Sequence, residues 1–107
     1  MITELVTFTL PARMTREQVV EAFRKSVATW SGNPDLIRKN YIYDADKGVA
    51  GGVYLWTSVE QAKRWHGEAF RKRIAEMFGH EPVSVYYETP IVVDNSARKV
   101  IDEGVTA

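Results

Sequence analysis

The chain has 107 residues, 45% of them hydrophobic, which suits one domain with its own core. Lysine and arginine number 14, as do aspartate and glutamate, so a net charge of zero argues against nucleic acid or an anionic membrane surface as partner. The absence of cysteine excludes disulfides and thiolate chemistry, and with no membrane span or export signal in the sequence we expect a soluble, cytoplasmic protein.

The first third of the chain predicts a strand followed by a helix. Residues 2–10 alternate with the period of a strand. Thr15 and Gln18 have the spacing of a capping box, and the helix that they begin runs to about Trp30. The Ser-Gly-Asn-Pro sequence at residues 31–34 ends it, because glycine accepts a left-handed terminus and proline cannot continue a helix.

The next segment predicts a β-hairpin. Residues 36–43 and 49–57 are rich in strand formers, and residues 44–48 supply the turn. We expect Ile37, Tyr41 and Tyr43 to share one face of the first of these strands. Neither strand has a purely polar face, which indicates that both sides of the sheet are covered.

A second helix begins at Ser58, with Gln61 expected to complete another capping box. Gly67 is unfavourable inside a helix, so we expect a kink or a break near His66. Gly79 ends the helix, and residues 82–89 form a fourth strand.

The last residues, 90–107, are expected to be a C-terminal arm of one domain that spans residues 1–107. Residues 91–93 are an exposed apolar segment, and residues 95–102 are expected to form a short helix capped by Asn95 or Ser96.

The predicted order is strand, helix, strand, strand, helix, strand, which is the βαββαβ order of the ferredoxin-like α+β fold. Both helices then lie on one face of a four-stranded antiparallel sheet. The other face is apolar, and a second copy of the chain would cover it. We therefore expect a homodimeric α+β barrel whose apolar arm reaches across the dimer.

Large aromatic side chains are numerous for so small a domain and predict a pocket for a flat aromatic ligand. His66 is the candidate catalytic base, because histidine exchanges protons near neutral pH and lies here on the apolar side of the second helix. The alternatives are that His66 is a buried residue bonded to a carbonyl and that each ring belongs to the core. The candidate ligand-contacting residues are Trp30, Tyr41, Tyr43, Tyr54, Trp56, Trp65, Phe70 and Tyr86.

Other kinds of site find little support in the sequence. It has no phosphate-binding loop, dinucleotide-binding fingerprint or metal-ligand cluster, so no metal is expected. Five basic residues of the second helix are interleaved with glutamates, and we interpret them as a solvated face rather than a nucleic-acid surface. They are Lys63, Arg64, Arg71, Lys72 and Arg73.

One segment carries a resemblance to a known family. The sequence Ala-Gly-Gly-Val-Tyr-Leu-Trp-Thr at residues 50–57, together with Tyr-Glu-Thr-Pro at residues 87–90, resembles the YdhR-type putative monooxygenase family of the dimeric α+β barrel superfamily. The resemblance covers roughly residues 2–95. Its superfamily includes cofactor-independent monooxygenases of aromatic compounds, haem-degrading monooxygenases, and small isomerases or lyases.

The resemblance implies an oxygenase without a cofactor. Haem-degrading relatives use an asparagine on the first strand and a histidine after the helix tryptophan; Trp65 matches the tryptophan, but the first strand lacks asparagine and the region near Ile74 lacks histidine. We therefore expect a cofactor-independent monooxygenase of a small aromatic or phenolic compound. The alternatives are a non-catalytic or stress-associated ligand-binding dimer, and an isomerase or lyase.

Overall fold

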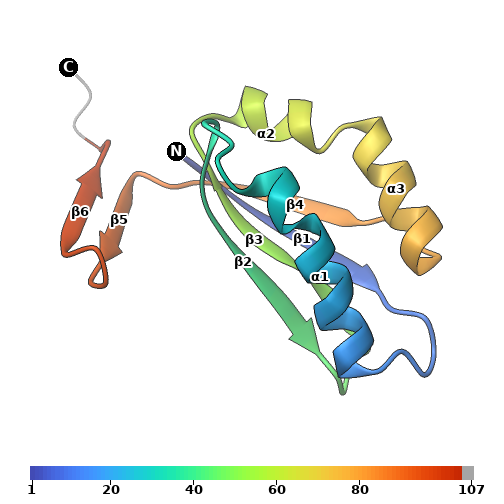
Figure 1. The fold of residues 1–107 in the computed structure, drawn as a ribbon. Coiled ribbons are helices and arrows are strands. Elements are labelled where there is room, and N and C mark those ends of the chain that lie inside the picture. The colour runs from blue at the N-terminus through green and yellow to red at the C-terminus, as the bar shows by residue number, and fades with distance from the viewer. Residues whose placement is uncertain (105–107) are drawn as a thin grey trace.

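The computed structural model describes residues 1–104 and has a four-stranded antiparallel sheet with helices on one face (Figure 1). The sheet has the strand order β2-β3-β1-β4, which confirms the predicted ferredoxin-like fold. The elements are β1 (Ile2–Thr9), α1 (Arg16–Trp30), β2 (Leu36–Asp44), β3 (Val49–Trp56), α2 (Val59–Trp65), α3 (Glu68–Phe78), β4 (Val83–Glu88), β5 (Ile91–Asp94) and β6 (Lys99–Asp102).

The capping residues place the helix starts as the sequence predicted. The Thr15 hydroxyl accepts a hydrogen bond from the Gln18 amide at 3.2 Å, and the Gln18 side chain accepts one from the Thr15 amide at 2.9 Å. At α2 only half of the motif forms. Ser58 accepts from the Gln61 amide at 3.3 Å, but the buried Gln61 Oε1 has no partner among the described residues.

The second helix is broken into α2 and α3, as predicted. His66 ends α2 with φ −103° and ψ 40°, and Gly67 precedes α3 with an extended backbone. The break lets α3 run in a different direction from α2, so that it covers the sheet beside α1 (Figure 1). Phe70, Ile74 and Phe78 are the side chains that α3 buries there.

Residues 91–102 form a β-hairpin, so the predicted helix over residues 95–102 is wrong. Val93 pairs with Val100 across β5 and β6, and the Asp94 carboxylate accepts a hydrogen bond from the Ala97 amide in the turn. Arg98 takes the left-handed conformation at φ 54°, which closes the turn. The β-branched residues of this segment favour the strand over the helix once a pairing partner is in reach.

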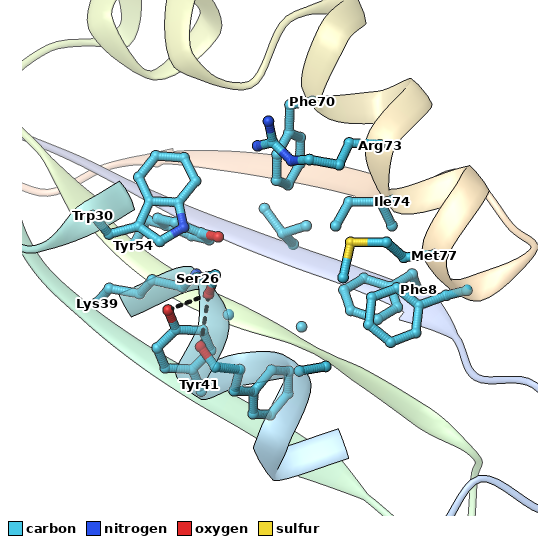
Figure 2. A pocket seen from close by; sticks show the side chains of 16 residues that line it. Phe8, Ser26, Trp30, Lys39, Tyr41, Tyr54, Phe70, Arg73, Ile74 and Met77 are labelled. Atoms are coloured by element: carbon cyan, nitrogen blue, oxygen red, sulfur yellow. Dashed lines mark hydrogen bonds between the residues drawn. The ribbon is translucent and has the colours of Figure 1, made fainter. Parts of the chain in front are cut away.

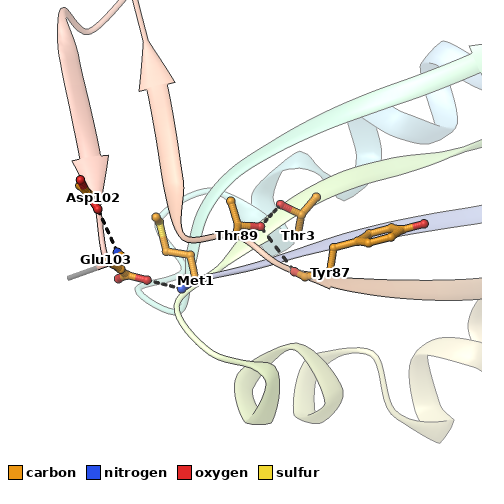
Figure 3. Close-up of polar contacts among 7 residues, drawn as sticks. Met1, Thr3, Tyr87, Thr89, Asp102 and Glu103 are labelled. Atoms are coloured by element: carbon orange, nitrogen blue, oxygen red, sulfur yellow. Dashed lines mark hydrogen bonds and ion pairs between the residues drawn. The ribbon is translucent and has the colours of Figure 1, made fainter. Parts of the chain in front are cut away.

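Polar contacts join the base of this hairpin to the start of β1 (Figure 3). The N-terminal amine of Met1 pairs with the Glu103 carboxylate, and the Met1 carbonyl accepts from the Thr89 amide at 2.9 Å. The hydroxyls of Thr3 and Thr89 also hydrogen bond to each other. These contacts hold the base of the hairpin against the start of β1.

The register of the strands decides which side chains meet the helices. Val6 and Phe8 of β1 and Tyr54 and Trp56 of β3 are buried beneath them. The opposite face of the sheet is open to solvent and apolar, with Val83, Val85 and Tyr87 exposed on β4. No helix within residues 1–104 combines the length and the apolar character that crossing a membrane requires.

Candidate functional site

A cavity lies between the sheet and helices α1 and α3 (Figure 2). Its volume is about 60 Å³, measured as space for the centres of water-sized molecules, which corresponds to roughly four to six waters at ~10–15 Å³ each. Its wall is formed mainly by aromatic and aliphatic side chains, and its non-aromatic polar side chains are those of Ser26, Lys39 and Arg73. The lining residues are Val6, Phe8, Ala22, Phe23, Ser26, Trp30, Lys39, Tyr41, Gly51, Gly52, Tyr54, Phe70, Arg73, Ile74, Met77 and Phe78.

Two glycines of β3 form the floor of this cavity. A Cβ atom on Gly51 would lie 1.8 Å from the Val6 carbonyl oxygen, so only glycine allows this approach of the strands. A Cβ atom on Gly52 would lie 2.9 Å from Tyr54 Cε1 and 3.0 Å from Lys39 Cε. Gly51 thus permits the close approach of β1, and Gly52 keeps free the space that Tyr54 and Lys39 occupy.

The hydroxyl groups of Ser26 on α1 and Tyr41 on β2 meet in the cavity wall. The Ser26 hydroxyl donates to the Phe23 carbonyl at 2.8 Å, and its oxygen lies 2.6 Å from the Tyr41 hydroxyl. Because serine has one hydroxyl proton, Tyr41 is the donor in the second bond. The remaining lone pairs of Tyr41 are free to accept a bond from a ligand.

Lys39 of β2 and Arg73 of α3 are the two charged groups of the cavity wall (Figure 2). Lys39 Nζ lies 3.8, 4.5 and 5.0 Å from the ring centroids of Tyr41, Tyr54 and Trp30. Burial, and to a smaller extent the charge of Arg73, lowers the pKa of Lys39 to about 7. Lys39 is therefore poised to exchange a proton near neutral pH.

Burial has the opposite effect on the pKa of Tyr54. It raises this pKa, and the neighbouring Tyr41 and Glu4 raise it as well. Tyr54 thus stays a neutral phenol that can donate a hydrogen bond.

A buried polar cluster lies behind the cavity. Glu4 Oε1 accepts hydrogen bonds from Trp56 Nε1 at 2.9 Å and from His66 Nδ1 at 2.7 Å. Glu4 Oε2 and His66 Nε2 are also buried and have no partner among the described residues. The His66 ring stacks on Phe70 at 4.0 Å and meets Tyr54 edge-on at 4.4 Å, so these two rings stand between it and the cavity.

The candidate residues from the sequence divide into two groups. Trp30, Tyr41, Tyr54 and Phe70 line the cavity, whereas Tyr43, Trp56, Trp65, Tyr86 and His66 do not.

The residues outside the lining have other surroundings. Trp65 is 38% exposed and donates to Asp35 at 3.1 Å. Tyr86 is half-buried, and burial together with the Glu4 carboxylate raises its pKa. Tyr43 packs against the core.

Sequence reasoning missed Ser26, Lys39 and Arg73. Alternation along β2 would have placed Lys39 beside Tyr41, since residues two apart share a face. An irregularity between Leu36 and Arg38 shifts the register, so Leu36 packs on the core while Ile37 is 43% exposed, contrary to the predicted face. Arg73 is exposed, as its assignment to a solvated face predicted, and in addition it contributes to the cavity wall, which nothing in the local sequence indicates.

The fold and this cavity define a class, the ferredoxin-like domains with a cavity between sheet and helices. Within that class the chain belongs to the family described as "Putative mono-oxygenase ydhR", which matches residues 5–89. Among solved structures, it is similar to a monooxygenase from the gene ActVA-Orf6 of Streptomyces coelicolor, crystallised with the ligand nanaomycin D. The TM-score is 0.62 at 16% identity, with 86% of this chain and 89% of that chain covered.

A comparison with functionally curated proteins found no significant match. Within residues 1–104, no three His, Asp or Glu side chains are grouped so that they could hold a metal ion.

Proposed function

We propose that the protein is a monooxygenase that acts on a small aromatic or phenolic compound bound in the cavity. The observation that carries this proposal is the cavity wall, in which aromatic rings surround a few hydroxyl and cationic groups. Such a wall excludes water from a planar ligand while its polar groups orient it. Family membership and the nanaomycin D complex of the similar structure support the same class of activity.

The proposed reaction takes its electrons from the substrate. A phenol or anthrone loses a proton, and the anion that forms passes an electron to dioxygen. One oxygen atom then enters the product and the other leaves as water. The chain contributes a dry pocket and groups that stabilise the anion.

The base proposed from the sequence is His66. Its ring is separated from the cavity by Tyr54 and Phe70, so direct proton transfer requires that Phe70 move from its stacked position. This role therefore needs a test that preserves the buried cluster. Asparagine at position 66 can still donate to Glu4 but cannot act as a base near neutral pH.

Oxygen uptake with a panel of hydroxyanthrones and hydroquinones tests the proposal. We expect uptake by the native protein with at least one compound and a loss of about 100-fold or more in His66→Asn if this residue is the base. Unchanged uptake in the variant would remove His66 from the mechanism. If no compound supports uptake although some bind, the cavity belongs to a non-catalytic binding protein; isomerised product without uptake would indicate an isomerase.

A further inference from the structure

Lys39 and Arg73 differ from several cations that lie on β2, α2 and α3. Arg38, Arg64, Arg71 and Lys72 each have a carboxylate oxygen within 4.0 Å. Neither Lys39 nor Arg73 has one within residues 1–104, and the cavity lining contains no aspartate or glutamate. The half-buried Lys39 and the exposed Arg73 thus line one largely apolar cavity without a counter-ion from this part of the chain.

This arrangement is unfavourable for an empty pocket. A cation removed from water loses hydration energy, and only the faces of Trp30, Tyr41 and Tyr54 compensate Lys39. Arg73 cannot relieve the repulsion by losing its proton, because guanidinium stays charged at neutral pH. An anion between the two groups would remove both penalties.

We propose that Lys39 and Arg73 form an oxyanion site for the acidic hydroxyl of an aromatic ligand, and that Lys39 takes up the proton of that hydroxyl. The inference rests on the proposed function only in placing the ligand in the same cavity. It specifies the ligand class as a phenol or enol that binds in its ionised form, and it makes Lys39 a second candidate base beside His66.

The proton transfer is balanced within the site. The O–H bond of the ligand breaks, its electron pair stays on the oxygen, and the neutral Lys39 amine becomes an ammonium. The new ammonium and the Arg73 guanidinium then hold the oxyanion by charge-assisted hydrogen bonds. The lowered pKa of Lys39 makes its neutral form available near pH 7.

No other group that faces Lys39 offers a competing charge. Tyr41 on β2 and Tyr54 on β3 are phenols, Arg73 on α3 is cationic, and α1 presents Ser26 and Trp30, which do not titrate. Glu4 of β1 lies beyond Tyr54, where His66 and Trp56 already engage its carboxylate.

Three probes that share a nitrobenzene ring test the site: 4-nitrophenol, 4-nitroanisole, which lacks the acidic hydroxyl, and 4-nitrobenzoate, which carries a carboxylate. Absorbance of the phenolate band reports the ionisation of bound 4-nitrophenol. We expect bound 4-nitrophenol to titrate at least about one pH unit below the free compound. We also expect it to bind about tenfold more tightly than 4-nitroanisole.

Variants of Lys39 and Arg73 test whether these two residues cause the shifted titration and the tighter binding of 4-nitrophenol. Lys39→Met and Arg73→Met should each restore the titration toward that of free 4-nitrophenol and weaken its binding about tenfold, with 4-nitroanisole binding unchanged. Lys39→Arg keeps a charge and should preserve the shift. Lys72→Met removes a neighbouring cation of α3 that pairs with Glu68, and should change nothing.

The inference is overturned if 4-nitrophenol does not bind, if it binds no better than 4-nitroanisole, or if Lys39→Met leaves its titration shifted. Tighter binding of 4-nitrobenzoate than of 4-nitrophenol would overturn the assignment to a hydroxyl. These outcomes are independent of turnover. A shifted titration without oxygen uptake would support the oxyanion site and contradict the oxygenase proposal. Oxygen uptake that is undiminished in Lys39→Met would support the oxygenase proposal and contradict the role of Lys39 as base.

Discussion

Glu4 is the residue whose role depends most on its tertiary surroundings. In the sequence it is one carboxylate within an alternating strand, on the same side as Val6 and Phe8. In the structure it is fully buried and joins β1 to Trp56 of β3 and to His66 at the end of α2. One carboxylate thus satisfies two buried donors from different elements.

We expect Glu4→Ala to lower the free energy of unfolding by about 3 kcal/mol, because it leaves the ring N–H groups of Trp56 and His66 buried without an acceptor. Glu4→Gln keeps an acceptor oxygen and should cost about 1 kcal/mol. Urea denaturation measures both. Glu21→Ala, which removes an exposed partner of Arg24, is the control and should change stability by less than about 0.5 kcal/mol. Equal losses in the two Glu4 variants would contradict this account.

At the scale of elements, local signals predicted most of the fold. Capping residues placed the starts of α1 and α2, and Gly67 marked the break that separates α2 from α3. The β5–β6 hairpin was missed because its Asn-Ser turn residues also suit a helix start, and only pairing with a second strand favours the extended form.

Two glycines that look equivalent in the sequence should respond differently to alanine. Gly51→Ala forces a Cβ atom against the Val6 backbone and should destabilise the domain by about 3 kcal/mol or more. Gly67→Ala has no contact shorter than 3.5 Å and an extended backbone that alanine accepts, so we expect a change below about 0.5 kcal/mol. Thermal melts of the two variants compare them directly. A Gly67→Ala variant as unstable as Gly51→Ala would show that the helix break needs glycine.

In the whole molecule, the sheet face opposite the helices and the hairpin expose several apolar side chains. Val83, Val85 and Tyr87 are 62%, 39% and 58% exposed on this face, and Val93 and Val100 are 66% and 62% exposed on the hairpin. A second copy that packs sheet against sheet would bury them. We therefore propose that the chain is a homodimer in which the hairpin lies against the partner.

Light scattering coupled to size-exclusion chromatography tests this proposal. We expect a dimer for the native chain and a monomer for Val85→Lys, because a charge within the proposed interface loses its hydration without gaining a partner. Val27→Lys introduces the same charge at an exposed position on α1 and should remain a dimer. A native chain that is monomeric at micromolar concentration would refute the proposal.

Local patterns predicted the order of the elements and the ferredoxin-like fold, because periods of two and 3.6 residues and capping motifs act within a few neighbouring positions. The segments at residues 50–57 and 87–90 carried the family resemblance. Packing between distant elements determines which rings line the cavity and brings Lys39 and Arg73 to its wall. That convergence depends on the register of β2 against β3, which pairs Lys39 with Tyr54, and on the direction that α3 takes after its break. The side chains of the cavity come from elements far apart in the chain, and local patterns carry no information about such long-range packing.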